Sequence, residues 1–330
     1  MTASPNTAMP ARAQVPASRR PAAGRVKPPI TRRISVRTVP YLLLAPAVLA
    51  ILGLLGYPVV SVVIDSFQNL GPRQVNLHLT EWVGFANYQE ILGDPDFWTI
   101  TLRTLAFTVG CVTAIMLGGL ACAQLMKHTN RVIRWVLQIS LLLAWAMPIL
   151  SVTTVYLFIF DQNYGILNKT LVNLGFSGFA HYDWFTTSFS TLTIITVMIA
   201  WQGVPFAAFT IYAGLVAVPG DLYEAVSIDG ASAWQSFRSV TWPGIKSIFM
   251  LTIFLEVLWD FKVFTQIWVI RNGGPDGGST TLSVLQYLDG IAGNHYGVAA
   301  AVSVVMIVLL AIITAQYLRM LVRSQEADFA

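Results

Sequence analysis

Charged side chains are scarce in this chain. Only 11% of its 330 residues are Asp, Glu, Lys or Arg, whereas soluble domains average about 25%. The mean hydropathy of +0.64 describes more apolar sequence than one soluble core can bury. This scarcity of charge excludes an ordinary soluble domain and predicts an all-α, polytopic membrane protein.

Cysteines and metal-binding patterns are also rare. The two cysteines, Cys111 and Cys122, lie on one predicted helix. Their spacing separates them by roughly 16 Å, which excludes a disulfide between them. The histidines fall in different predicted loops or span ends, without the spacing of a metal site; they are His78, His128, His181 and His295. We therefore expect no metal and no cofactor on this chain.

Motifs of bond-making chemistry are missing as well. The sequence has no Gly-Lys dipeptide, and therefore no phosphate-binding loop of the G-x-x-x-x-G-K-[ST] kind. It also has no serine nucleophile elbow. The net charge of +4 comes from basic residues in the N-terminal tail and in predicted cytosolic segments, so it does not indicate a nucleic-acid partner. The chain is expected to be no enzyme and to bind no nucleic acid.

Six charge-poor runs are long enough to cross a bilayer. They are predicted at 38–64, 104–126, 135–160, 192–215, 245–270 and 297–318. The predicted segments are a disordered basic tail at 1–37, the first span and an external loop at 38–97, a transmembrane core at 98–323 and a short polar tail at 324–330. Within the core, a polar loop at 219–243 separates the fourth span from the fifth.

Basic residues favour one side of the predicted membrane. They concentrate in the N-terminal tail, in 127–134, around the polar loop and at the C-terminal end. Because basic loops stay in the cytoplasm, both termini and the polar loop are expected there. The tail itself is expected to be a topology anchor, with binding to anionic lipid as the alternative.

The polar loop carries clear local signals. Residues 218–243 read VPGDLYEAVSIDGASAWQSFRSVTWP. Pro219-Gly220 ends the preceding helix, and Asp221 is a candidate cap for a short helix that follows. Asp229-Gly230 then predicts a turn, because glycine tolerates positive φ.

A second short helix is predicted at 231–240. Trp234 and Phe237 are three residues apart and would share one face of it, and Pro243 would end it. The whole loop is therefore expected to form a helix-turn-helix knob that faces water at one membrane surface.

This loop resembles the EAA loop of binding-protein-dependent ABC transporter permeases, whose pattern runs roughly E-A-A, three residues, G, nine residues and I-x-L-P. The residues in register are Glu224, Ala225, Asp229, Gly230, Ala231, Phe237 and Pro243. Val226 replaces the second Ala, and residues 240–242 replace the I-x-L part. In the family this loop docks into a cleft on a cytoplasmic ATPase subunit, so the resemblance implies that these residues couple the chain to an ATPase.

Three external segments, 83–88, 94–98 and 161–168, also resemble this family. The resemblance covers most of the chain, from about Val39 to Arg323, and indicates the sugar-type branch, similar to maltose- and glycerol-3-phosphate-system permeases. It implies a second permease subunit, two ATPase subunits that hold ATP-Mg and an extracytoplasmic solute-binding protein. It also implies the inner or plasma membrane of a prokaryote, and transport by alternating access.

Charged residues inside the fifth predicted span are unusual. Glu256 and Asp260 are four residues apart and share a helix face, while Lys262 lies about 200° from Asp260 on an ideal helix. Charges at membrane depth face a bundle interior, a partner or water. The pair is predicted to border the substrate path, with an ion pair between two permease subunits as the alternative.

Aromatic and polar side chains near these charges suit a sugar, whose rings have apolar faces and many hydroxyls. Candidate contributors are Trp201, Gln202, Tyr212 and Trp259, each with packing as the alternative role. Pro205 would kink the fourth span and open a groove. Two other functions stay open: an ion-coupled secondary transporter that uses Glu256 and Asp260, and a membrane scaffold or sensor that binds an ATPase without transport.

Overall fold

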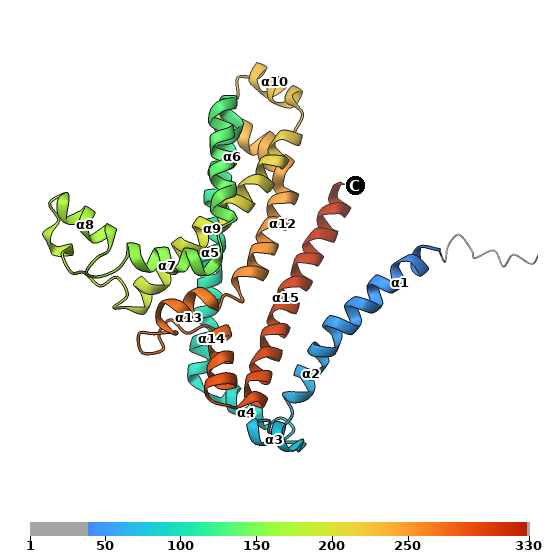
Figure 1. Cartoon of the computed structure of the whole chain (residues 1–330). Helices are drawn as coiled ribbons and strands as arrows, with labels where there is room; N and C mark the ends of the chain where they lie inside the picture. Colours follow the sequence, from blue (N-terminus) through green and yellow to red (C-terminus); the bar gives the residue numbers. More distant parts are fainter. Residues whose placement is uncertain (1–38, 329–330) are drawn as a thin grey trace, which may run out of the picture. The chain divides into compact units, whose positions relative to one another are not determined.

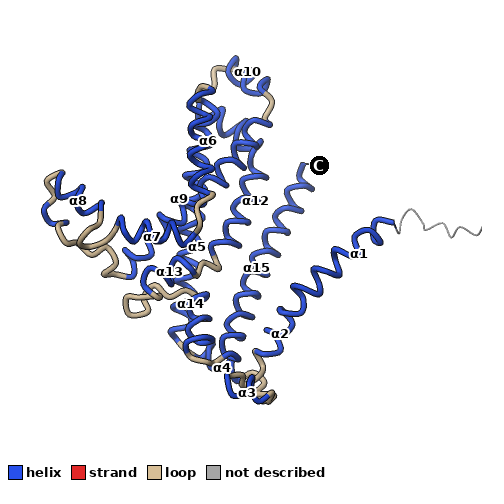
Figure 2. Tube along the Cα trace, in the orientation of Figure 1, coloured by secondary structure: helices blue, strands red, loops and turns tan. Residues whose placement is uncertain are grey.

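The computed structural model describes the backbone of residues 39–328 and the side chains of 41–321. These residues form helices and loops only, apart from one isolated β-bridge between Gln68 and Trp82, as Figure 2 shows. The all-α prediction is confirmed. The predicted disordered tail at 1–37 lies outside the described residues, and residues 324–328 of the predicted polar tail belong to the last helix.

The helices follow one another along the chain as labelled in Figure 1. The α-helices are α1 (Val39–Ile51), α2 (Tyr57–Asp65), α3 (Pro72–Leu77), α4 (Ala86–Gly93), α5 (Pro95–His128), α6 (Arg131–Trp145), α7 (Ile149–Ile159), α8 (Ile166–Asn173), α9 (Ser188–Ala217), α10 (Gly220–Ile228), α11 (Ala233–Ser236), α12 (Trp242–Asp260), α13 (Thr265–Arg271), α14 (Leu282–Tyr287) and α15 (Tyr296–Asp328). Short π-helices occur at η1 (Leu52–Gly56), η3 (Phe237–Thr241) and η4 (Leu288–Ala292), and a 3₁₀ turn at η2 (Ser177–Phe179).

Contacts divide the chain into two units, Met1–Leu54 and Leu55–Ala330. The described part of the first unit is α1 with the start of η1, and its large apolar side chains are exposed. The run Tyr41–Asp65 has the length and hydropathy of a membrane span. An apolar surface of this kind suits lipid rather than water.

Five helical runs of the described chain are long and apolar enough to cross a membrane, and a sixth is obtained if the bent pair α6–α7 is one span. The other four single runs are Pro95–His128, Ser188–Ala217, Ala233–Asp260 and Tyr296–Leu321. This confirms the predicted polytopic bundle. The predicted boundaries at 97/98 and 323/324 both fall inside helices, α5 and α15.

The third predicted span, 135–160, consists of two helices and not of one continuous helix. α6 and α7 meet at an angle of 98° across Ala146–Pro148. Proline lacks the N–H that would continue α6, and it keeps the residue before it out of the helical region. Gln202 Nε2 of α9 donates to the Met147 carbonyl at 2.8 Å, which satisfies an acceptor that the break releases.

The fifth predicted span, 245–270, is also wrong in its extent. α12 ends at Asp260, a short non-helical connection follows, and α13 is a separate helix that begins at Thr265. Hydropathy was the wrong guide here because it measures apolar content and not helical continuity. The break places the charged residues of this run at a helix end instead of in its middle.

The first core cluster lies mainly between α5 and α9. Glycines let these two helices approach closely: a Cβ on Gly119 would lie 2.6 Å from the Ala207 Cβ, and one on Gly203 would lie 2.7 Å from Ile115 Cδ1. Ile115, Ile195 and Ile211 are fully buried there. This close packing explains why α5 and α9 form a fixed frame on which the other helices rest.

A second core cluster joins α5, α14, α15 and the connection after α12. Its buried members include Phe97, Phe261, Leu282, Ala301 and Val302. Nearby, Arg103 Nη1 of α5 donates to the carbonyls of Gly277 and Thr280, at 3.0 Å each. These two bonds attach the glycine-rich loop before α14 to the frame.

Candidate functional site

The loop between α9 and α12 is built from well-terminated short helices. α10 ends in a Schellman motif: the Gly230 N–H donates to the Ser227 carbonyl at 3.1 Å, and the Ala231 N–H donates to the Val226 carbonyl at 3.2 Å. This geometry requires a positive φ, and Gly230 has φ +74°. The turn predicted at Asp229-Gly230 is therefore confirmed, with a specific role for the glycine.

The start of α10 differs from the prediction. Pro219 occupies the N-cap, no side chain caps the helix, and Asp221 lies in the first turn. A carboxylate at this place still interacts favourably with the positive end of the helix dipole. α11 has the complete cap instead, because Ser232 and Gln235 satisfy each other's backbone N–H groups in a capping box.

Pro243 does not end the loop, which corrects the prediction. The helical run continues from Ala233 through η3 into α12 and reaches Asp260. The Trp242 N–H donates to the Phe237 carbonyl five residues earlier, as in a π-turn. That wider turn precedes Pro243, which has no N–H to donate, so the proline is accommodated in the first turn of α12.

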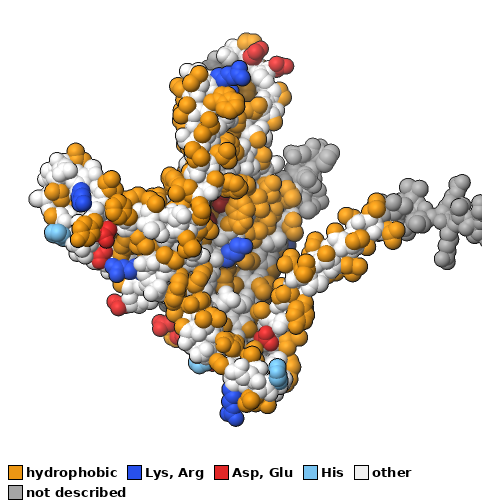
Figure 3. Space-filling view, viewed as in Figure 1, with side chains coloured by type: hydrophobic (Ala, Val, Ile, Leu, Met, Phe, Trp, Pro, Cys, Tyr) orange, Lys and Arg blue, Asp and Glu red, His pale blue; other side chains and the backbone are white. Residues whose placement is uncertain are grey.

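Apolar side chains are exposed on this loop. Ile228 is 86% exposed and Trp234 is 70% exposed, and the Trp234 ring stacks on Phe237 with centroids 5.6 Å apart. Figure 3 shows that acidic and basic side chains gather around the same end of the molecule, near α10. A loop that combines charge with exposed apolar residues is suited to contact another protein.

Tyr223 connects this loop to the frame. Its hydroxyl and the Thr241 hydroxyl are 3.1 Å apart and share a hydrogen bond. Lys127 Nζ, at the end of α5, lies 3.9 Å from the centre of the Tyr223 ring, which is a cation–π contact. α10 is thus held at once to α5 and to the start of α12.

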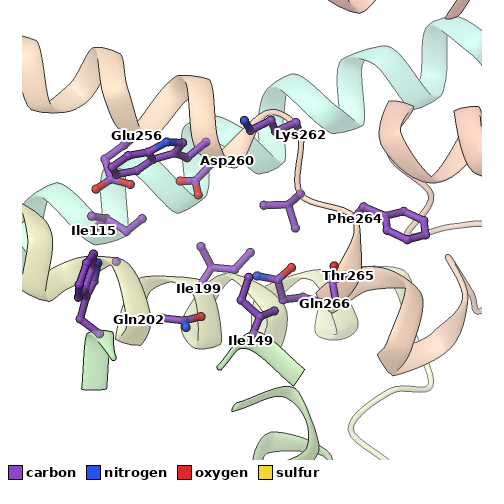
Figure 4. Close-up of a pocket in the computed structure, with 14 residues that line it drawn as sticks. Ile115, Ile149, Ile199, Gln202, Glu256, Asp260, Lys262, Phe264, Thr265 and Gln266 are labelled. Carbon is purple, nitrogen blue, oxygen red and sulfur yellow. The ribbon is translucent and has the colours of Figure 1, made fainter. Parts of the chain in front are cut away.

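A second candidate site lies at the opposite end of α12. A cavity of about 400 Å³ is lined by α5, α6, α7, α9, the end of α12 and the connection to α13. Figure 4 shows the carboxylates of Glu256 and Asp260 beside this cavity, with Gln202 across from them. Glu256 is 2% exposed and Asp260 is 5% exposed, so both acids are buried.

Both acids lack compensation within the described residues. Glu256 Oε1 and Asp260 Oδ2 are buried oxygens without a hydrogen-bond partner. The only salt bridge that the structure describes joins Arg271 to Asp183 at 2.9 Å, outside this cavity. Unpaired buried carboxylates oppose folding, so stability alone does not account for their position.

Comparison with known proteins identifies the family of this chain. A family model described as "Binding-protein-dependent transport system inner membrane component" matches residues 110–324. The chain belongs to this family. It is therefore a permease: a membrane subunit of an ABC transporter, and not a catalytic one.

Several relatives of this permease carry the names of sugar transport systems. It is 44% identical over 290 residues to the diacetylchitobiose uptake system permease protein DasB of Streptomyces coelicolor, covering 88% of each chain. It is 32% identical over 238 residues to the trehalose/maltose transport system permease protein MalF of Thermococcus litoralis, covering 72% of this chain and 79% of that one.

A solved structure supports the fold. The permease matches a crystal structure of a bacterial ABC transporter involved in the import of the acidic polysaccharide alginate, with a TM-score of 0.71. The match covers 86% of this chain and 96% of that one at 18% identity, so it shows the fold alone. None of these findings supports the alternative of an ion-coupled secondary transporter.

The structure brings some of the predicted path residues together and separates others. Gln202, Glu256, Trp259 and Asp260 all line the cavity, whereas Trp201 and Tyr212 do not. Trp201 lies near the Tyr156 ring, 6.5 Å between centroids, and Tyr212 lies near Arg134, 5.9 Å from the ring centre to the guanidinium.

Sequence reasoning missed other residues that line the cavity. These are chiefly Trp145, Thr265 and Gln266. Lys262, which lies about 200° from Asp260 on an ideal helix, also lines it. No sequence pattern marks these positions, because they meet only through the breaks after α6 and α12.

Proposed function

We propose that this permease, together with a second permease subunit, imports a saccharide that a solute-binding protein delivers from outside. Two cytoplasmic ATPase subunits would hold ATP-Mg and supply the force. The saccharide names of the relatives support this proposal, and the exposed, capped loop between α9 and α12 is the single observation that carries it. A permease that carries no ATPase of its own needs an exposed surface of this kind to contact an ATPase subunit.

The loop would transmit ATPase motion as a rigid body. Glu224, Ala225 and Ala231 belong to the α10–α11 knob, and Asp229 and Gly230 form the turn between its helices. The run Ala233–Asp260 has 28 residues, or about 42 Å at 1.5 Å per residue. It joins the knob directly to the carboxylates beside the cavity. ATP binding can move this helix only through contacts that differ between the two states of the ATPase.

The cavity would be a binding site on the solute path. Its volume of about 400 Å³ lies in the range of small-molecule pockets. Trp259 supplies an aromatic face, and Gln202, Glu256 and Asp260 supply polar groups. Alternating access would open this cavity to each side of the membrane in turn.

Both termini and the α10 knob would face the cytoplasm. Lys127 and Arg134 lie at the same end of the spans as α10, as their contacts with Tyr223 and Tyr212 indicate, and this agrees with the positive-inside bias. Labelling of an Ile228→Cys variant tests this. A membrane-impermeant maleimide should react with it in inverted vesicles and not in intact cells; the reverse pattern would refute the orientation.

The function is tested by gentle purification of the tagged chain from its native membrane. An ATPase, a second permease and a solute-binding protein should co-elute, and the reconstituted assembly should accumulate a saccharide only when ATP is supplied. Accumulation that is driven by an ion gradient in the absence of the ATPase would refute the proposal.

A further inference from the structure

We propose that the cavity beside Glu256 and Asp260 selects a solute that carries a positive charge, namely a saccharide with a free amino group. This inference rests on the proposed import function and deepens it, because it names the chemical class of the solute. It follows from two buried carboxyl groups beside the cavity that have no partner of opposite charge among the described residues.

The two carboxyl groups are buried and unpaired. Glu256 and Asp260 are almost completely buried, and each has one oxygen that no described residue contacts by a hydrogen bond. Both residues line the cavity, and Figure 4 shows the Asp260 carboxylate directed into it, toward Ile199. Such groups take up a proton unless a cation or several donors offset the lost hydration of their ionised form.

The chain supplies too little positive charge to the cavity. Among the residues that line it, the titratable groups are Glu256, Asp260 and Lys262. Lys262 is exposed, and it forms no salt bridge with either acid. Two carboxyl groups therefore face one ammonium group, and a bound cation would stabilise their ionised form.

The remaining lining favours a saccharide over a bare inorganic cation. Trp145 and Trp259 offer aromatic surfaces, and Thr265 and Gln266 offer hydrogen-bonding groups. A hydroxyl-bearing ring can stack on such aromatic faces, while its ammonium group donates to the carboxylates. A neutral saccharide could donate hydroxyl hydrogens to the same oxygens, but it would leave their charge uncompensated.

Three disaccharides with the same β-1,4 linkage distinguish the effect of ligand charge on binding from the effect of ligand shape. Chitobiose carries free amines, N,N′-diacetylchitobiose carries neutral amides, and cellobiose carries hydroxyls at the same positions. Binding to the full-length chain in nanodiscs would be measured by tryptophan fluorescence at neutral pH, where an ordinary amino group is largely protonated and an ordinary carboxyl group is ionised. Chitobiose should bind at least about tenfold more tightly than cellobiose, the scale of one charge-assisted hydrogen bond.

Variants of the charged residues test which side chains cause the preference for chitobiose. The double variant Glu256→Gln/Asp260→Asn should bind the three sugars within about twofold of one another, and Lys262→Gln should increase the preference for chitobiose because it removes a like charge. Asp96→Asn removes an exposed acid that does not line the cavity, and it should behave as the wild type. Monodisperse elution of each variant verifies that it is folded.

Several outcomes would overturn the inference. Equal binding of chitobiose and cellobiose by the wild type, which needs no variant, would do so. A preference for chitobiose that persists in the double variant, with or without weaker binding of all three sugars, would show that the two acids do not recognise the amino group. Uptake by the complete transporter separates the two proposals: ATP-driven import of neutral and charged saccharides alike refutes this inference only, whereas no saccharide import refutes the proposed function as well.

Discussion

The two ends of the helical run Ala233–Asp260 differ in which side chains they expose and which they bury. At the α10–α11 end, polar backbone groups are satisfied locally and apolar side chains are exposed. At the Asp260 end, apolar surroundings are packed and two charged side chains are buried without partners. The first arrangement suits a flat protein surface, and the second suits a small polar solute. One continuous helical run joins them.

This contrast shows how each end is specified. The knob depends on residues within about 25 positions of one another, and its turns and caps can be assigned one at a time. The cavity depends on residues from Ile115 to Gln266, which helix breaks and close helix packing bring together. Changes at the knob should therefore impair coupling, whereas changes at the cavity should impair solute recognition.

The largest expected effect is at the turn of the knob. Gly230→Pro cannot adopt φ +74°, and it removes the N–H that binds the Ser227 carbonyl, a cost of about 3 kcal/mol or more to the local fold. ATP-driven uptake should fall at least about tenfold while the bundle still inserts. Gly220→Ala is the matched control, because a Cβ there meets no atom within 4 Å and its φ is not positive. Normal uptake by Gly230→Pro would remove the knob from the mechanism.

The next effect is at the cavity. Gln202→Leu leaves the Met147 carbonyl at the α6–α7 break without its donor, and it should destabilise the fold by about 1–3 kcal/mol. Gln266→Leu is the comparison, since Gln266 lines the same cavity and contributes no hydrogen bond to that break. Thermal unfolding in detergent would measure both. Equal melting temperatures for the two variants would contradict a structural role for Gln202.

A smaller effect is expected where the knob meets the frame. Tyr223→Phe removes the bond to Thr241 but keeps the ring under Lys127, at a cost of about 0.5–1.5 kcal/mol. Tyr223→Leu should add about 0.5–1 kcal/mol, because it also removes the cation–π contact. Hydrogen exchange of the α10 amides should quicken in that order. Unchanged exchange in Tyr223→Leu would show that α10 is held by other contacts.

The smallest effect on stability is expected at Asp289, which lies outside both the knob and the cavity. Burial raises the pKa of Asp289 in η4. The negative charges of Glu90 and Asp94 raise this pKa further, whereas the nearby His295 lowers it. A raised pKa in the folded state favours the protonated form, so the charged form costs stability above the ordinary carboxyl pKa. Asp289→Asn should therefore raise the melting temperature slightly at neutral pH. It should have no effect below the ordinary pKa of an aspartate, about 3.9. A lower melting temperature at neutral pH would contradict this sign.

Much of the fold and of the knob could be predicted because the responsible forces act locally. The fourth span, the Asp229-Gly230 turn and the pairing of Trp234 with Phe237 follow from hydropathy and from backbone preference. The continuation through Pro243 could not be predicted, because it depends on the wider turn of η3. Hydropathy also did not predict where α6 and α12 end, because apolar residues suit the membrane interior whether or not the helix is continuous.

The sequence by itself determined that the chain enters a membrane, that it lacks a motor, and that residues 218–243 form a helical knob. It also determined that Glu256 and Asp260 share a face. Only the tertiary structure decided which side chains surround those acids, because Trp145, Gln202, Lys262 and Gln266 meet around one cavity. The reason is physical: caps and turns depend on neighbours along the chain, whereas the environment of a buried charge depends on atoms that distant helices bring together.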